Sequence, residues 1–185
     1  MQLSISSQRW LNRLLSNPLW RDRPVLAWAF YDWANSAFSL LVVTAFVPLM
    51  LGGFWNDGAA SPVTTFRLGV GNAVASAVVV LLAPLLGAIT DQAGRRKSWL
   101  ATFTALGVLA TVGLAAVGPG GWPLAMVCFV LASIGFFAAN SLYDALLIDV
   151  APPAAYDRVS ALGYALGYLG SALLFVLSIA MLVQP

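Results

Sequence analysis

The chain has 185 residues, of which 61% are hydrophobic and only 9% charged, and its net charge is +2. Soluble domains carry about 25% charged residues, so this composition excludes an ordinary water-soluble domain. The small net charge argues against nucleic-acid binding, and a single cysteine, Cys128, excludes a disulfide framework or a multi-cysteine metal site within the chain. We therefore expect an all-α, polytopic membrane protein in a lipid bilayer, without metal, cofactor or nucleic acid.

Residues 1–24 are predicted to form a cytoplasmic amphipathic segment. Apolar residues alternate with arginines at helical spacing: Trp10, Leu11, Leu14, Leu15, Leu19 and Trp20. Because no apolar core appears before Val25, a cleavable signal peptide is not expected. The segment would lie on the inner membrane surface. The alternative is a basic tail that only sets the topology.

Apolar runs long enough to cross a bilayer predict five transmembrane helices within one bundle of residues 25–185. Their approximate bounds are 25–52, 66–90, 98–117, 124–150 and 159–183. Glycine- and proline-rich turns separate several of the runs. None of the connections is long enough to fold as a soluble domain.

The positions of the cations predict the orientation, because Lys and Arg near span ends are retained in the cytoplasm. Most of them fall on one side of the predicted membrane: Arg9, Arg13, Arg21, Arg23, Arg95, Arg96, Lys97 and Arg158. Only Arg67 is expected on the other side. We therefore expect a cytoplasmic amino terminus and an external carboxyl terminus.

Asp32 is the most costly residue of the first span. It lies about seven residues beyond Val25 and so about 10 Å into the hydrocarbon. A central aspartate costs roughly 2.5–3.5 kcal/mol on insertion, which marks it as a functional candidate. Tyr31 is its neighbour, and Asn35 shares its helix face. The alternative is a hydrogen bond to an adjacent helix.

The fourth span repeats this pattern, with Asn140 and Asp144 on one face and Tyr143 beside them. Because the first and fourth spans run in opposite directions, Asp144 and Asp32 are expected at similar depth. We therefore predict one cavity for a small solute or protons, lined by Tyr31, Asp32, Asn35, Asn140, Tyr143 and Asp144. Two carboxyl groups facing one cavity could serve proton coupling, although each could simply bond a neighbouring helix.

The fifth span carries small residues at helical spacing. Gly163, Gly167 and Ser171 recur every four residues, and Gly170 adjoins them. Small residues allow close approach of helix backbones in membranes. We expect these four residues to form a helix-packing face.

The segment GAITDQAGRRK, residues 87–97, joins the second and third spans and ends in Lys97. It resembles the signature loop of the major facilitator superfamily of secondary transporters. The matching residues are Gly87, Asp91, Gly94, Arg95, Arg96 and Leu100, whereas Ile89 replaces a common leucine and Gln92 a usual cation.

Two further stretches resemble a bacterial branch of that superfamily related to the yeast vacuolar amino-acid effluxer of autophagy. Residues 27–49 are similar to its opening helix, and residues 151–170 to the start of its fifth helix. The resemblance covers most of the chain from Ala27 onward. It implies the first five helices of a major facilitator fold in a bacterial cytoplasmic membrane, and transport of small solutes by alternating access. Amino acids are indicated only by the relative's activity.

The resemblance also implies a gating loop. In the family the loop aspartate, here Asp91, braces the inner gate, and a loop arginine, here Arg95 or Arg96, pairs with an acid ending the fourth helix, here Asp149. Exposed charges at a helix mouth can exchange partners as bundles move. A purely topological role for the arginines is the alternative.

The length of the chain departs from the family pattern of two six-helix halves. We expect an amino-terminal part of a transporter, or a split carrier completed by a second polypeptide or a copy of itself. A non-transporting membrane scaffold is a further alternative. An intramembrane enzyme is not expected, because neither Asp32 nor Asp144 has the glycine-flanked context of presenilin-like proteases. The loop also lacks the further aspartates of phospholipid-headgroup transferases.

Overall fold

The computed structural model describes residues 22–56, 58–93 and 95–183, and every regular element in these ranges is helical. The elements are α2 (Arg23–Ala37), the π-helix η2 (Phe38–Phe46), α3 (Val47–Gly52), α4 (Ser61–Ala93), α5 (Arg96–Leu114), α6 (Trp122–Ala145), α7 (Leu147–Val150), the 3-10 helix η3 (Pro153–Ala155) and α8 (Tyr156–Val183). The predicted amphipathic segment lies outside the described residues, except for its last three.

Five helical segments are long and apolar enough to cross a membrane, which confirms the predicted all-α fold. They are Arg23–Gly52, Ser61–Ala88, Arg96–Leu114, Trp122–Val150 and Pro153–Val183. The second begins at Ser61 rather than near Phe66 because its first polar side chains find partners locally. The Thr64 hydroxyl donates to Asn56 Oδ1 at 3.0 Å, and the Thr65 hydroxyl donates to the Ser61 carbonyl at 3.1 Å.

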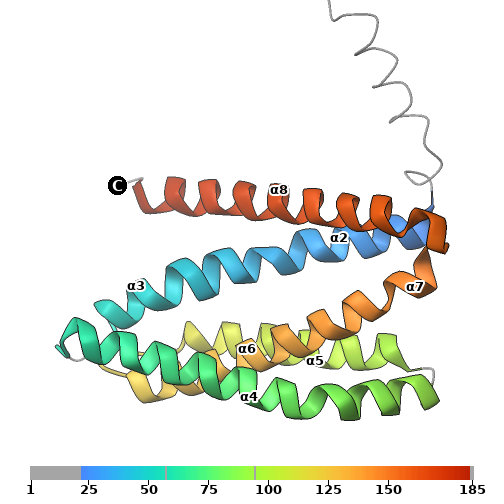
Figure 1. The fold of residues 1–185 in the computed structure, drawn as a ribbon. Coiled ribbons are helices and arrows are strands. Elements are labelled where there is room, and N and C mark those ends of the chain that lie inside the picture. The colour runs from blue at the N-terminus through green and yellow to red at the C-terminus, as the bar shows by residue number, and fades with distance from the viewer. Residues whose placement is uncertain (1–21, 57, 94, 184–185) are drawn as a thin grey trace, which may run out of the picture.

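The helices form two groups that run side by side (Figure 1). The first span, α2–η2–α3, packs along α8, whereas α6 packs against α4 and α5. The start of α2, the α4–α5 connection and the start of α8 lie at one end of the bundle, and the α5–α6 connection lies at the other. Successive spans therefore alternate in direction.

Glycines set the close helix contacts. A Cβ atom added at Gly163 would fall 2.6 Å from the Trp28 ring, and one at Gly167 would fall 2.5 Å from the Asp32 carboxylate. On the other side of the bundle, a Cβ at Gly135 would fall 2.5 Å from the backbone nitrogen of Gly107. Side chains at these positions would push the helices apart, so α8 approaches α2, and α5 approaches α6, through bare backbone.

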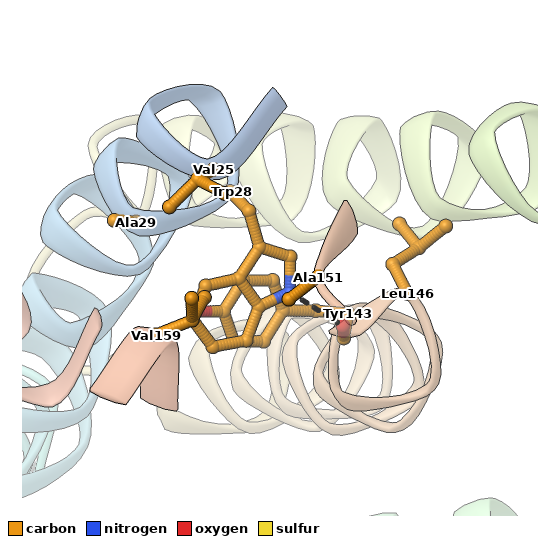
Figure 2. Packing of buried hydrophobic residues seen from close by; sticks show 7 residues of the cluster. All are labelled: Val25, Trp28, Ala29, Tyr143, Leu146, Ala151 and Val159. Carbon is orange, nitrogen blue, oxygen red and sulfur yellow. Dashed lines mark hydrogen bonds between the residues drawn. The ribbon is translucent and has the colours of Figure 1, made fainter. Parts of the chain in front are cut away.

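A buried aromatic cluster joins α2 to α6 beside the start of α8 (Figure 2). The Trp28 and Tyr143 rings stack with centroids 4.3 Å apart, and Trp28 Nε1 donates to the Tyr143 carbonyl at 3.0 Å. Val25 and Val159 are fully buried against this stack. The pair contributes about 0.5–1.5 kcal/mol beyond simple burial and fixes the position of Tyr143.

Candidate functional site

A cavity of about 650 Å³ lies between the first span, α6 and α8. Its wall is unusually polar for a membrane bundle. The lining residues are Trp28, Asp32, Ser36, Ser39, Leu40, Thr44, Phe136, Asn140, Tyr143, Asp144, Leu147, Ser160, Tyr164, Tyr168 and Ser171. The volume falls in the range of about 300–1,000 Å³ that is typical of small-molecule sites.

Asp32 on α2 and Asp144 on α6 both line this cavity. Asp32 is half-buried and accepts a hydrogen bond from the Ser36 hydroxyl at 3.2 Å. Its carboxylate points toward α8, where only a glycine, Gly167, leaves room for it. Asp144 is exposed at the open side of the cavity, so the carboxyl predicted to be buried on α6 is not covered by these helices.

Tyr143 brings a buried hydroxyl into the same wall. Its ring is sandwiched between Trp28 and Tyr31, whose centroids lie 4.3 Å and 5.1 Å away. The hydroxyl is buried and has no hydrogen-bond partner among the described residues. It would lie only 3.0 Å from a Cβ atom at Gly163, so it is directed toward α8.

Tyr31 and Asn35 line a different cavity from the other four residues of the predicted set. This second cavity, of about 350 Å³, lies between the first span, α5 and α6 and is mostly apolar. The Tyr31 and Thr104 hydroxyls share a hydrogen bond of 2.9 Å there. Asn35 Nδ2 donates to Asn140 Oδ1 at 2.5 Å, so an amide pair separates the two cavities. The two cavities lie on different sides of the contact between the first span and α6, one toward α8 and the other toward α5.

The π-helix explains why Thr44 lines the cavity, which the sequence reasoning missed; Ser39, seven residues after Asp32, shares the Asp32 face even in a regular α-helix. In a continuous α-helix Thr44, twelve residues after Asp32, would lie about 120° around the axis from it. The wider i→i+5 winding of η2 reduces the rotation per residue and turns Thr44 toward the cavity beside Ser39. The Thr44 hydroxyl donates to the Ser39 carbonyl, five residues earlier, at 2.9 Å. No sequence signal marked this change of winding.

The remaining hydroxyl and aromatic residues of the cavity were also missed, although one could have been found. Ser36 lies four residues after Asp32 and shares its face, which is readable from the sequence. Ser160, Tyr164 and Tyr168 on α8 reach the cavity only because α8 packs beside α2. Their role depends on contacts between distant segments.

The predicted packing residues on α8 face the first span. Gly163 and Gly167 lie against Trp28 and Asp32, and a Cβ at Gly170 would fall 2.6 Å from the Trp33 ring. Ser171 is buried and lines the cavity.

The charged loop residues gather at one end of the bundle. Arg96 Nη1 lies 3.2 Å from Asp149 Oδ2 on α7 and 3.4 Å from the Ala145 carbonyl. Arg95 and Lys97 are exposed, and Gly87 lies near the end of α4. Gly94 and the side chain of Asp91 lie outside the described part of the structure. Of the two loop arginines that the resemblance offered as partners of Asp149, the structure pairs Arg96 with it.

Sequence comparison decides the family. The profile of the Major Facilitator Superfamily matches residues 5–175. The chain belongs to the major facilitator superfamily. It is therefore a multi-pass membrane protein of a transporter family.

Two relatives from this comparison cover most of the chain. The uncharacterised MFS-type transporter YxiO of Bacillus subtilis is 38% identical over 158 residues, which are 85% of this chain and 37% of the relative. An uncharacterised protein of Aquifex aeolicus is 29% identical over 161 residues, which are 86% of this chain and 39% of that protein. No solved structure matches significantly. The chain thus spans less than half the length of these two relatives.

Proposed function

We propose that these helices form one wall of the solute pathway in a secondary transporter that works by alternating access. The observation that carries the proposal is the polar cavity between the first span, α6 and α8, which holds Asp32 and Asp144. Ionisable residues inside membrane spans are costly, and they commonly mark substrate or ion pathways. The membership of the chain in a family of transporters supports the same proposal.

The coupling ion that we propose is the proton. Asp32 and Asp144 are the acidic residues of the cavity wall, and the described chain contains no histidine. A carboxyl that faces a membrane cavity can take up and release a proton as access alternates. The resemblance to the branch of the yeast vacuolar effluxer adds amino acids as the first solutes to test.

We propose the Arg96–Asp149 pair as part of the gate on the cytoplasmic side. Arg96 begins α5 and Asp149 lies on α7, so the pair links the third span to the end of the fourth. The Asp149 side chain is 51% exposed, which lets water compete for the pair when the helices separate. Asp91 would brace the same gate.

The orientation follows from the end at which the cations gather. Arg23, Arg95, Lys97 and Arg158 lie at the same end of the bundle as Arg96, whereas Arg67 lies near the other end. We propose that the first end faces the cytoplasm, with the amino terminus inside and the carboxyl terminus outside, in a bacterial cytoplasmic membrane.

The decisive experiment reconstitutes the protein, expressed from its complete reading frame, in liposomes with an imposed proton gradient. Uptake of a radiolabelled amino-acid mixture is measured together with the internal pH. We expect uptake by the wild type and a loss of about tenfold or more for Asp32→Asn, because the substituted amide cannot carry the proton. Asp157→Asn, at an exposed position in the first turn of α8, is the matched control and should transport normally.

A second candidate function is supported by the apolar cavity between the first span and α5. Its lining of Leu41, Val42, Val108 and Val112 would suit a further helix from a second polypeptide or a copy of the chain. In that case the chain acts as a membrane scaffold or as one subunit of a split carrier. Co-purification separates the two functions: if Asp32→Asn impairs assembly but leaves flux unchanged, the scaffold is favoured.

A further inference from the structure

We propose that the cavity between the first span, α6 and α8 binds a small organic cation, with its ammonium or guanidinium group held between Asp32 and Asp144. The inference rests on the proposed transport function and specifies the charge class of its solute.

The charged side chains of the cavity wall are all acidic. Asp32 and Asp144 line it, and no Lys or Arg is among the lining residues that the structure describes. The cations of the first, second and fifth spans, Arg23, Arg67 and Arg158, lie near the helix ends. In a low-dielectric bundle, carboxylates are stable only when a counter-charge or a proton accompanies them. A bound organic cation supplies that charge.

The unpartnered hydroxyl of Tyr143 is an independent sign of a ligand. The side chain is only 5% exposed, and its oxygen has no hydrogen-bond partner within the described ranges. Buried polar atoms in proteins nearly always have a partner. Tyr143 lines the cavity together with Asp32 and Asp144. The oxygen is covered by α8 at Gly163, so a movement of α8 must uncover it; once uncovered, it can accept a hydrogen bond from the cationic group that the carboxylates attract.

Aromatic side chains complete a wall suited to a cation. The faces of Tyr143 are already covered by Trp28 and Tyr31, so this residue offers its hydroxyl rather than its ring. Tyr164 and Tyr168 lie one turn apart on α8, line the cavity and are 63% and 76% exposed. Their ring faces are available for a cation–π contact, which strengthens when the site is dry.

The same wall disfavours other solutes. A neutral zwitterion would place its carboxylate in a cavity wall without a basic side chain, close to two carboxylates. An anion would meet only like charge, which costs affinity. Hydroxyls such as Ser39, Thr44 and Ser171 can hydrogen-bond any solute, so they do not set the charge preference.

The test uses four probes that vary in charge: agmatine, arginine, citrulline and glutamate. Citrulline is the neutral counterpart of arginine, and agmatine lacks the carboxylate. Binding to the purified protein in detergent is measured by isothermal titration calorimetry. We expect agmatine to bind most tightly, arginine next and citrulline about tenfold or more weakly than arginine, because the neutral ureido group of citrulline cannot form charge-assisted hydrogen bonds to the carboxylates. Glutamate should not bind.

Variants assign the effect to the cavity. Asp32→Asn and Asp144→Asn should each weaken agmatine binding about tenfold or more, whereas Asp157→Asn should not. The two cavity variants are made separately, so that one remains informative if the other is not monodisperse in detergent. Citrulline or glutamate binding as tightly as agmatine overturns the inference, and so does the absence of agmatine binding to folded protein.

Flux measurements keep this inference distinct from the transport proposal. Agmatine binding that depends on Asp32, without counterflow of agmatine in liposomes, leaves the cation site standing and contradicts transport. Counterflow of citrulline or glutamate with no preference for cations supports transport and overturns the cation site.

Discussion

The two ends of the bundle are held together by different kinds of contact. Near Arg67, buried polar groups connect α3, α4 and the start of α6. At the opposite end, Arg96 and Asp149 form an ion pair with a half-exposed carboxylate. The first kind of contact is costly to break, whereas exposed ion pairs are worth about 0–1 kcal/mol. The Arg96–Asp149 ion pair should therefore separate more easily than the Asn56 network, although the cationic end also holds the buried cluster of Trp28 and Tyr143.

The Arg67 end shows how such a network is built. Asn56 is 5% exposed; its amide oxygen accepts hydrogen bonds from Thr64 at 3.0 Å and from Arg67 at 3.3 Å. The Arg67 guanidinium also lies 3.7 Å from the centroid of the Trp122 ring. The loop after α3 thus binds the start of α4, and Arg67 of α4 in turn contacts the start of α6.

Two connecting loops also dock directly at this end. Trp55 Nε1 donates to the Val117 carbonyl at 3.2 Å, and the Gly120 amide donates to the Phe54 carbonyl at 3.0 Å. Gly120 has φ of 72°, a conformation that favours glycine. The loops after the first and third spans therefore form one unit.

The largest expected effect on stability is that of Trp55→Ala. Trp55 is 3% exposed and packs with Leu51, Val117 and Phe129, so its truncation should lower the free energy of unfolding by about 3–5 kcal/mol. Thermal unfolding in detergent, followed by circular dichroism, measures the loss. Trp99→Ala at the cationic end is the matched control, because Trp99 is only partly buried. An equal loss there would contradict the difference between the ends.

Asn56→Ala should have the next largest effect, lowering the free energy of unfolding by about 1–3 kcal/mol. The substitution removes the acceptor for Thr64 and Arg67 and leaves a buried hydroxyl without its partner. Asn72→Ala is the control, because the Asn72 amide donates to the Leu68 carbonyl of its own helix. Combining Asn56→Ala with Thr64→Val should give less than the sum of the single losses; strict additivity would show that the two side chains are not coupled.

Arg67→Gln should cost about 0.5–2 kcal/mol, because it removes the cation from the Trp122 ring. In a double-mutant cycle, Trp122→Leu should therefore cost less free energy of unfolding in the Arg67→Gln protein than in the wild type, because the cation–π contact is already lost. A coupling energy near zero between Arg67 and Trp122 would show that their contact does not contribute.

The smallest effect should come from Asp149→Asn, at less than about 1 kcal/mol. Its carboxylate is 51% exposed, and salt screens such pairs. The difference between wild type and variant, measured by thermal unfolding, should shrink as salt is raised. A large, salt-independent loss would place the Arg96–Asp149 pair among the contacts that hold the fold, rather than among those that open.

The sequence by itself determined the number of spans, their alternating directions and the gathering of cations at one end. Backbone polar groups in hydrocarbon must bond within their own segment, so apolar runs of sufficient length become helices whatever surrounds them. The pairing of Asp149 with an arginine of the loop came from the family resemblance of the loop, not from the apolar pattern.

Only the tertiary structure decided which polar residues share a cavity. Asp32 and Asn35 lie on the same stretch of helix, yet Asp32 lines the cavity that α8 completes and Asn35 lines the cavity that α5 completes. The turn of Thr44 into the cavity depends on the π-helix, and the partners of Trp55 and Asn56 come from other helices and loops. These features follow from contacts between segments far apart in the chain, which local hydrophobic patterns do not encode.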